Sequence, residues 1–434
     1  MIQQGRRDRR ITTLALATAA ALAAVSFGGA ATAADPVGEF EGQEIVLSRW
    51  AGDPWTAGQM AAAEEWAAAT GGTVVFDAIP YENLRDKQAL TLSSGGDYDM
   101  AYIHPSWFGE FAQAGYFYPI DDFLADPAMN AEGFSGASYI PGILAQGNYD
   151  GVQYCVQDFI STVLLAYRKD LFDAAGIAPP ETLDDIVAAA QALDGQDGIS
   201  GITLAGKRTG AIADNLSTLI TAQDNWWYDD DLNVTLDPAA AEVAVDFYTA
   251  VAPYTPEGLL NFHIDEASTA AAQGQAAMVI ASTPSLSALE DPERSSTVGL
   301  WGYAPLAVTA GDPAGELIYW NWCISANSEH PEAAYSFLSW FTGAEQQAKI
   351  AVATAAAGAT EDFYQDEEVL AQLPFLTAMN AALGNKSNPQ PSIGAWGKAQ
   401  DQIELAVQES ISGNMTSAEA AASMVEALEA ALGS

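Results

Sequence analysis

Tryptophans in polar loops are the residues of this sequence best suited to binding chemistry. The chain has 11 Trp, and many of them stand beside or near Gly, Pro, Asp or Asn: Trp50, Trp55, Trp107, Trp226, Trp227, Trp320, Trp322 and Trp396. The apolar face of a sugar ring stacks on an indole ring, while Asp, Asn and Arg side chains bind its hydroxyl groups. For any one ring, core packing is an equally good explanation. Trp66, Trp301 and Trp340 lie in helical or strand patterns, which favours core packing for them.

Local motifs for catalysis or metal binding are weak. Residues 201–208, GITLAGKR, approach a phosphate-binding loop, but Arg208 replaces the Ser or Thr that would hold magnesium. Residues 229–233 have calcium-loop spacing, but Val234 replaces the required Gly, which favours a solvated hairpin tip. The sequence contains no HExxH, GxSxG or CxxC. We therefore expect no catalytic residue, no metal ligand and no cofactor, although a glycosidase pair is defined by spatial separation and cannot be judged from spacing.

The first 34 residues have the organisation of a secretory signal. An apolar segment, 11–27, follows a basic region, and a run of small residues follows the apolar segment. The basic region contains Arg6, Arg7, Arg9 and Arg10. We expect cleavage before Ala34 or Asp35, and both Sec and twin-arginine export remain open. No Cys stands at the cleavage point, so a lipid anchor is not expected, and no later segment has the roughly 18 apolar residues of a spanning helix.

The composition indicates an acidic globular protein. The chain has 15 Lys+Arg against 57 Asp+Glu; removing the signal leaves 15 − 4 = 11 cations and 57 − 1 = 56 anions. Such a surface repels nucleic acid and anionic lipid, so neither is an expected partner. The acidity fits a salty habitat or a cationic ligand. At 49% hydrophobic and 10% aromatic residues the chain is not a disordered acidic tail, and its length suits two or three domains.

Strand and helix patterns alternate near the start of the mature chain. Strands are predicted at 44–50, 73–79 and 98–104, with helices at 58–72 and 81–96 between them. This order predicts a parallel sheet with crossover helices. Ligands of such sheets bind beyond the carboxyl ends of the strands. The residues directly after the first and third strands, Trp50 to Trp55 and His104 to Trp107, are therefore expected at a site.

Further along the chain, helix starts are marked by capping residues. Asp237 followed by Pro238 predicts one start, and Thr182 with Asp185 predicts another by a capping-box pattern. A short helix at 169–175 should end at Gly176. The segment 386–396 is the best candidate for a crossing between lobes. Cys155 and Cys323 lie far apart in the sequence, and the residues alone leave open a disulfide or two buried thiols.

The stretch LLAYRKDLFDAAGIAPPETLDD, residues 164–185, resembles a signature of the extracellular solute-binding proteins of bacterial ABC importers. The similarity is to the sugar-binding type related to maltose-binding protein. Other stretches match the family in the same order: SSGGDYDM at 93–100, AGYFYPIDDF at 114–123, YDGVQYCVQ at 149–157, GQAAMVIAS at 274–282, CISANSEHPEAAYSFLSWFT at 323–342, and residues 389–424. The resemblance covers nearly all of the chain after residue 34.

This resemblance implies the periplasmic binding protein fold, in which two α/β lobes enclose a ligand cleft and are joined by hinge strands. Lobe one would comprise 35–154 plus 325–387, and lobe two 158–319 plus 390–434. The hinge crossings would be 155–157, 320–324 and 388–389. Cys155 and Cys323 then fall on neighbouring hinge strands, which favours a disulfide between them.

The resemblance also implies which residues contact the ligand. Carried over position by position, they are Trp50, Asp53, Trp55, His104, Trp107, Asp158, Ser161, Trp226, Trp227, Trp320, Asn321 and Trp396. Two departures from the family pattern bear on the ligand. Gln157 stands where the family usually has Pro, and Pro284 stands where an aromatic residue often stacks on sugar.

From the resemblance we expect a periplasmic protein that is not an enzyme. It would capture a carbohydrate, meaning a sugar, an oligosaccharide or a sugar alcohol, close its lobes on it, and deliver it to the transmembrane permease subunits of an ABC transporter. We expect a monomer. The acidity keeps a cationic solute such as a polyamine as an alternative ligand, and an exported glycoside hydrolase is the alternative of another class.

Overall fold

The computed structural model describes residues 35–51, 55–140, 142–229, 231–354, 357–360, 362–365, 367–391, 393 and 396–433. The predicted signal peptide, 1–34, and the predicted ligand contact Asp53 lie outside these ranges. Within them, none of the helices has the length and apolar character needed to cross a membrane.

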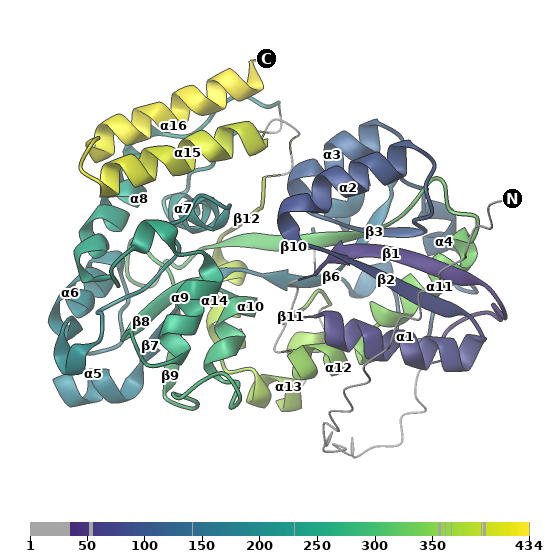
Figure 1. The fold of residues 1–434 in the computed structure, drawn as a ribbon, viewed down its shortest axis with the longest axis horizontal. Coiled ribbons are helices and arrows are strands. Elements are labelled where there is room, and N and C mark those ends of the chain that lie inside the picture. Colours follow the sequence, from purple (N-terminus) through teal and green to yellow (C-terminus); the bar gives the residue numbers. More distant parts are fainter. Residues whose placement is uncertain are drawn as a thin grey trace, which may run out of the picture. The chain divides into compact units, whose positions relative to one another are not determined.

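The strands form a large mixed sheet, a three-stranded sheet and a small hairpin (Figure 1). The large sheet has the order β11-β6-β10-β3-β1-β2, and β12 pairs with β10 away from this path. Its strands are β1 (Glu44–Trp50), β2 (Thr73–Ile79), β3 (Met100–Ile103), β6 (Cys155–Ser161), β10 (Gly315–Ile324), β11 (Ala357–Gly358) and β12 (Ser387–Pro389). The three-stranded sheet has the order β8-β7-β9, from β7 (Val163–Arg168), β8 (Met278–Ser282) and β9 (Trp301–Pro305); the hairpin is β4 (Asn148–Tyr149) and β5 (Val152–Gln153).

The parallel part of the large sheet agrees with the prediction. β1 pairs in parallel with β2 on one side and with β3 on the other, so the first strand lies in the middle. The carboxyl ends of the three strands therefore meet at one edge. The neighbouring strand β10 runs antiparallel to both β3 and β6, which the local sequence pattern did not predict.

The helices are as follows: α1 (Thr56–Thr70), α2 (Tyr81–Ser93), α3 (Pro105–Gln113), α4 (Asp121–Ala125), α5 (Lys169–Ala175), α6 (Leu183–Leu193), α7 (Ala211–Thr221), α8 (Pro238–Val251), α9 (Ile264–Ala272), α10 (Thr283–Leu286), α11 (Pro331–Phe341), α12 (Ala344–Thr354), α13 (Glu367–Gln372), α14 (Leu376–Asn385), α15 (Trp396–Ile411) and α16 (Ser417–Leu432). Figure 1 shows α2 and α3 on one side of the β1–β3 region and α1 on the other, the arrangement of an α/β fold.

The predicted capping residues occupy the predicted places. Thr182 accepts a hydrogen bond from the backbone N–H of Asp185, whose carboxylate accepts one from the backbone N–H of Thr182. Asp237 caps α8, with Pro238 as its first residue. Gly176 ends α5 with a φ of 67°, a left-handed conformation that is strained for residues with a Cβ.

Two hydrophobic cores flank the crossing strands. The first contains Ile45, Leu47 and Ile103 of the parallel sheet, and the second contains Leu216 of α7 and Val407 of α15. In β7 alternate side chains serve different cores: Leu164 and Ala166 belong to the first, Val163 and Leu165 to the second. The sheet β8-β7-β9 is therefore covered on both faces.

Helix α14, which falls within the predicted lobe one, lies on the three-stranded sheet β8-β7-β9. Phe375, directly before α14, packs edge-on against Tyr303 of β9, with 6.2 Å between the ring centroids. The boundary predicted at 387 thus falls after a segment that contacts the sheet of the other predicted lobe.

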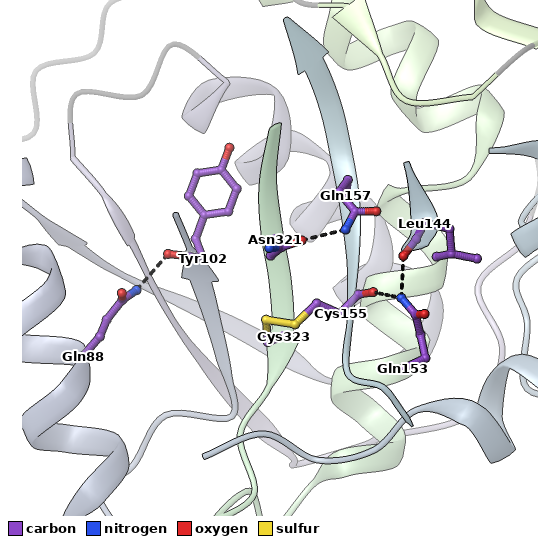
Figure 2. Close-up of a disulfide and its surroundings, with 8 residues drawn as sticks. All are labelled: Gln88, Tyr102, Leu144, Gln153, Cys155, Gln157, Asn321 and Cys323. Atoms are coloured by element: carbon purple, nitrogen blue, oxygen red, sulfur yellow. Dashed lines mark hydrogen bonds between the residues drawn. A yellow bond between two sulfur atoms is a disulfide. The ribbon is translucent and has the colours of Figure 1, made fainter. Parts of the chain in front are cut away.

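A disulfide joins two neighbouring strands of the large sheet (Figure 2). Cys155 of β6 and Cys323 of β10 are directly opposite in the antiparallel register, both are fully buried, and their sulfur atoms are bonded. Gln153 supports this region: its Nε2 donates to the carbonyl oxygens of Leu144 and Cys155, at 2.7 Å each. The bond therefore lies inside the pair of strands that carry the chain between the two cores.

Candidate ligand-binding site

A cavity of about 940 Å³ is lined by residues from around both cores. Its volume is near the upper end of the range for small-molecule sites, roughly 300–1,000 Å³. One wall is mainly aromatic and comes from the ends of β1, β2 and β3 together with β6 and β10. The other wall is polar and comes from α7, α9 and the segments around β8 and β12.

The aromatic wall is built at the carboxyl edge of the parallel strands. Trp50 ends β1, Tyr81 follows β2 by two residues, and His104 follows β3 directly. Trp320 of β10 joins them: its ring is 6.0 Å from Trp50 in a stacked arrangement and 4.9 Å from His104 edge-on. On the side away from the cavity Trp320 stacks on buried Tyr102, with 4.6 Å between centroids. Because these rings support one another, the wall is held in place before any ligand arrives.

An irregularity in the strand pairing accompanies Trp320. Tyr319 pairs with Ile160 and Asn321 with Gln157, so β6 advances three residues where β10 advances two. Extra residues of this kind locally change the direction of side chains in a sheet. Trp320 lies at this position and lines the cavity, while fully buried Asn321 faces Gln157 with 2.6 Å between their side-chain amides (Figure 2). The Gln at position 157, a departure from the family pattern, thus contacts β10.

His104 contributes a hydrogen-bond donor of defined orientation. Its Nδ1 accepts the backbone N–H of Ser106 at 3.2 Å and caps α3. Burial lowers the pKa of His104 to about 3, so the imidazole is neutral at physiological pH. A neutral ring whose Nδ1 accepts must carry its proton on Nε2. The site therefore has a donor on its aromatic wall.

The polar wall has acceptors at its centre. Asp214, in the first turn of α7, accepts a hydrogen bond from Gln390 Nε2 at 3.0 Å. Gln390 follows β12, and its backbone N–H donates to Leu317 of β10 at 2.9 Å. Ser268 of α9 adds a hydroxyl group. The wall is thus assembled from segments far apart in the sequence.

Charges at the cavity are balanced, in contrast with the chain as a whole. Two carboxylates, Asp214 and Asp265, and two cations, Lys207 and Arg294, line the same space. Burial raises the pKa of Asp214 to about 6, and hydrogen bonds from Gln390 and Glu316 oppose that rise. Near neutral pH the cavity therefore has no large excess of either sign, although the chain carries a formal charge of −42.

Five of the predicted ligand contacts line this cavity together: Trp50, Trp55, His104, Ser161 and Trp320. Trp55 stacks on Phe159 with 3.7 Å between centroids, and the Ser161 hydroxyl accepts a hydrogen bond from Thr283 at 3.0 Å. The structure brings them together because Trp50, His104 and Ser161 end or directly follow strands of the large sheet, Trp55 precedes α1 after β1, and Trp320 lies within β10. Asp53 lies outside the described residues.

Three other predicted contacts lie behind the cavity wall. Trp107 is buried and stacks on His104 at 4.9 Å, so it supports a lining residue. Asp158 accepts a hydrogen bond from Gln59 of α1, which also bonds the buried guanidinium of Arg49. Asn321 is the third, as described above. None of these side chains lines the cavity.

Trp226, Trp227 and Trp396 are elsewhere, and for them the prediction of cleft contacts is corrected. Trp227 is fully buried in the second core and donates through its indole N–H to Ser217 at 2.8 Å. Trp396 packs edge-on against Trp227 at 5.3 Å and is also buried. Trp226 is half-buried at the edge of the same core. Large aromatic rings bury the most apolar area of any side chains, so this pair serves the core.

The sequence-based prediction missed Tyr81, Asp214, Gln390 and Lys207. Tyr81 follows a parallel strand, and the rule applied to the other two strands would have found it. Lys207 belongs to the stretch 201–208, which was set aside because it only approaches a phosphate-binding loop. Asp214 and Gln390 carry no local signal, because one is inside a helix and the other follows a three-residue strand. No group of three or more His, Cys, Asp or Glu in the described ranges is arranged to hold a metal ion.

The chain is similar to proteins of a known family. The family model described as "Bacterial extracellular solute-binding protein" matches residues 53–348. A probable ABC transporter-binding protein of Deinococcus radiodurans is 25% identical over 329 residues, covering 73% of this chain and 76% of the relative. The mannitol-binding protein of Pseudomonas aeruginosa is 25% identical over 265 residues, which is 59% of each chain.

Solved structures share the fold. An ABC transporter solute-binding protein from Agrobacterium radiobacter in complex with ribitol superposes with a TM-score of 0.79 at 23% identity, covering 91% of this chain and 99% of that one. The architecture is therefore the α/β fold of periplasmic binding proteins, and the relatives are solute-binding proteins, not enzymes. Because the family model matches well over half of the sequence, this chain belongs to the bacterial extracellular solute-binding proteins.

Proposed function

We propose that this protein is the substrate-binding component of an ABC importer and that it captures a neutral carbohydrate, either a sugar, an oligosaccharide or a sugar alcohol. The observation that carries the proposal is the cavity with an aromatic wall facing a polar one. Trp50, Tyr81 and Trp320 offer flat apolar surfaces to C–H groups. Asp214 and Gln390 offer acceptors, and His104 offers a donor. A hydroxyl group both donates and accepts, so a polyhydroxylated molecule can satisfy both kinds of group at once.

A neutral ligand is favoured over the cationic alternative by the charges at the cavity. A polyamine has donors only, and it would leave the Nε2–H of His104 without an acceptor. It would also bring positive charge close to Lys207 and Arg294. The mannitol-binding relative and the ribitol complex support a polyol or sugar as the ligand class.

We also propose that ligand binding closes two lobes around hinge crossings at 155–157, 320–324 and 388–389. β6, β10 and β12 carry the chain past the cavity at these positions. A ligand that contacts both walls binds the closed arrangement more tightly than an open one, and this difference in affinity shifts the population towards closure. Trp320 and Asn321 would sit within one of these crossings.

Export, location and partners complete the proposal. Residues 1–34 would be a cleaved signal peptide, and the mature monomer would act in the periplasm. The closed form would dock on the transmembrane permease subunits of its transporter. Membership of the extracellular solute-binding family supports this role.

Thermal-shift and calorimetric titration with D-mannitol, ribitol, maltose and spermidine test the proposal. A ligand that binds only the folded state raises the melting temperature according to RT ln(1 + [L]/Kd). We expect at least one of the first three to do so, and spermidine to have no effect. A shift with spermidine and none with a wide panel of sugars and polyols would contradict the carbohydrate assignment. Release of products from a labelled oligosaccharide would instead indicate a hydrolase.

A further inference from the structure

Behind the polar wall, buried carboxyl groups surround the residue that faces the cavity. Glu316 of β10 is 1% exposed and Glu404 of α15 is 2% exposed. Glu316 hydrogen-bonds Asp214, and Gln390 bonds the same carboxylate. One polar cluster thus joins three parts of the chain that are distant in the sequence: strand β10, helix α7 and the segment after β12.

The hydrogen-bond donors of this cluster, the Gln390 amide on Asp214 and the Ser217 hydroxyl on Glu316, are fewer than its acceptors. Glu316 Oε2 and Gln390 Oε1 are both buried, and neither has a partner among the residues that the structure describes. Asp214 accepts a hydrogen bond from the Gln390 amide N–H, and as an ionised carboxylate it has no hydrogen to donate to Glu316. Glu316 is buried, so it cannot be ionised beside an ionised Asp214 without a large cost. A proton on Glu316 resolves the conflict, because the carboxyl O–H then donates to Asp214.

The other titratable groups around Asp214 do not supply that proton by direct contact. Glu404 accepts the backbone N–H groups of Gly210 (2.9 Å) and Ala213 (3.3 Å), so its hydrogen bonds go to the start of α7. The remaining groups that interact electrostatically with Asp214 are the phenols of Tyr81 and Tyr248 and the imidazole of His263. Of these, Tyr248 is hydrogen-bonded to Asn215 at 2.7 Å.

A second feature is that the cluster reaches the cavity. Asp214 and Gln390 both line the cavity, and so does Ser268, whose hydroxyl is buried and also lacks a partner within the described part of the chain. Gln390 is 6% exposed and Ser268 is 2% exposed. Polar groups that are buried without partners are costly, and a hydroxylated ligand would supply the missing bonds.

We propose that Asp214 and Glu316 share one proton, which Glu316 holds, and that the ionised carboxylate of Asp214 is the acceptor that anchors ligand hydroxyl groups. This inference rests on the proposed carbohydrate-binding function, and it names Asp214 as the residue that makes ligand affinity depend on pH. When a second proton reaches Asp214, the carboxylate is lost as a full acceptor and ligand binding weakens. Glu316 acts as a positioning residue, because it touches Asp214 and not the cavity.

Ligand affinity measured against pH tests the proposal on the unmodified protein. Burial raises the pKa of Asp214 to about 6, so the ionised fraction is nearly complete at pH 7.5 and about one tenth at pH 5. The dissociation constant for whichever of D-mannitol, ribitol or maltose binds should therefore rise about tenfold between these two values. A constant that changes less than twofold would overturn the proposal.

Variants assign the effect to its residues. Asp214→Asn should bind at least tenfold more weakly at pH 7.5 and lose the pH dependence. Glu316→Gln replaces the carboxyl O–H donor with an amide N–H, so it should keep both the affinity and its pH dependence. Exposed Asp246 of α8 gives the matched control, Asp246→Asn, which should behave as the wild type. If the pH dependence disappears in His263→Gln and persists in Asp214→Asn, the imidazole is responsible and the proposal is wrong.

Infrared spectroscopy of the ligand-free protein gives a second readout. Burial raises the pKa of Glu404 to about 8, so this carboxyl is also protonated at pH 7.5, and the spectra are recorded on the Glu404→Gln variant. In that background a protonated carboxyl should give a C=O band that the additional Glu316→Gln substitution removes. Retention of the band in that variant would overturn the shared proton. If none of the three probes binds the wild type at any pH, the proposed function fails, while the infrared result still decides the proton's place.

Discussion

Replacing Cys155 and Cys323 with alanine should lower the free energy of unfolding by about 5 kcal/mol. The disulfide links residues 168 apart in the sequence. The chain-entropy relation for a loop of that length corresponds to about 5 kcal/mol at room temperature, because the bond restricts the unfolded chain. With an unfolding entropy of about 2.1 cal/mol/K per residue over about 400 residues, the expected fall in Tm is about 6 °C.

Urea denaturation and calorimetry, each with and without a phosphine reductant, measure this effect. Reductant should lower the stability of the unfolded-and-refolded wild type to that of the double variant, and it should leave the variant unchanged. The single variant Cys155→Ala should match the double variant, since one sulfur cannot form the bond. A difference below about 1 °C in Tm, or an equal response of wild type and variant to reductant, would refute the reasoning.

Three further predictions concern the cavity and the helices. Trp320→Ala removes a ring that lines the cavity, and it should raise the dissociation constant for the bound carbohydrate at least tenfold in calorimetric titration. The control is Trp226→Ala, at a half-buried residue away from the cavity, which should leave the constant unchanged. Equal effects of the two variants would contradict the assignment of the site. Burial raises the pKa of Glu404 to about 8, above its ordinary value near 4.5. The stability that its protonated form contributes is therefore complete below about pH 4.5 and is lost as the pH rises through 8. Glu404→Gln should flatten the fall of Tm between pH 5 and 8.5. An unchanged slope would show that this carboxyl is not the cause. Thr182→Ala removes the cap of α6 and should cost about 1 kcal/mol in urea unfolding, and no change would mean that the capping box does not stabilise the helix.

Local signals predicted the parallel strands and the helix starts. β1, β2 and β3 have short apolar runs separated by helical periodicity, and both properties depend on neighbouring residues alone. The same holds for Thr182, Asp237 and Gly176, whose side chains or φ angles act within one helical turn. The rule that ligands bind at the carboxyl edge of such a sheet then placed Trp50 and His104 at the cavity.

Residue type alone was a poor guide to the remaining tryptophans. Trp227 and Trp396 resemble site residues in their polar surroundings, yet they pack on each other in the second core. An indole ring binds equally well to a sugar or to another ring, so only the fold decides its partner. Position within the fold separated them from Trp320, which stacks on Tyr102 and still lines the cavity.

By itself the sequence determined the secondary structure, the family resemblance and the edge of the sheet at which a ligand site should lie. It did not determine the polar wall, because Asp214 and Gln390 are 176 residues apart and meet only when α7, β10 and β12 pack together. The buried state of Glu316 is likewise a property of that packing. Long-range contacts set burial, and burial sets both the charge of a carboxyl group and what it can bind, which is why the tertiary structure alone decided the chemistry of this site.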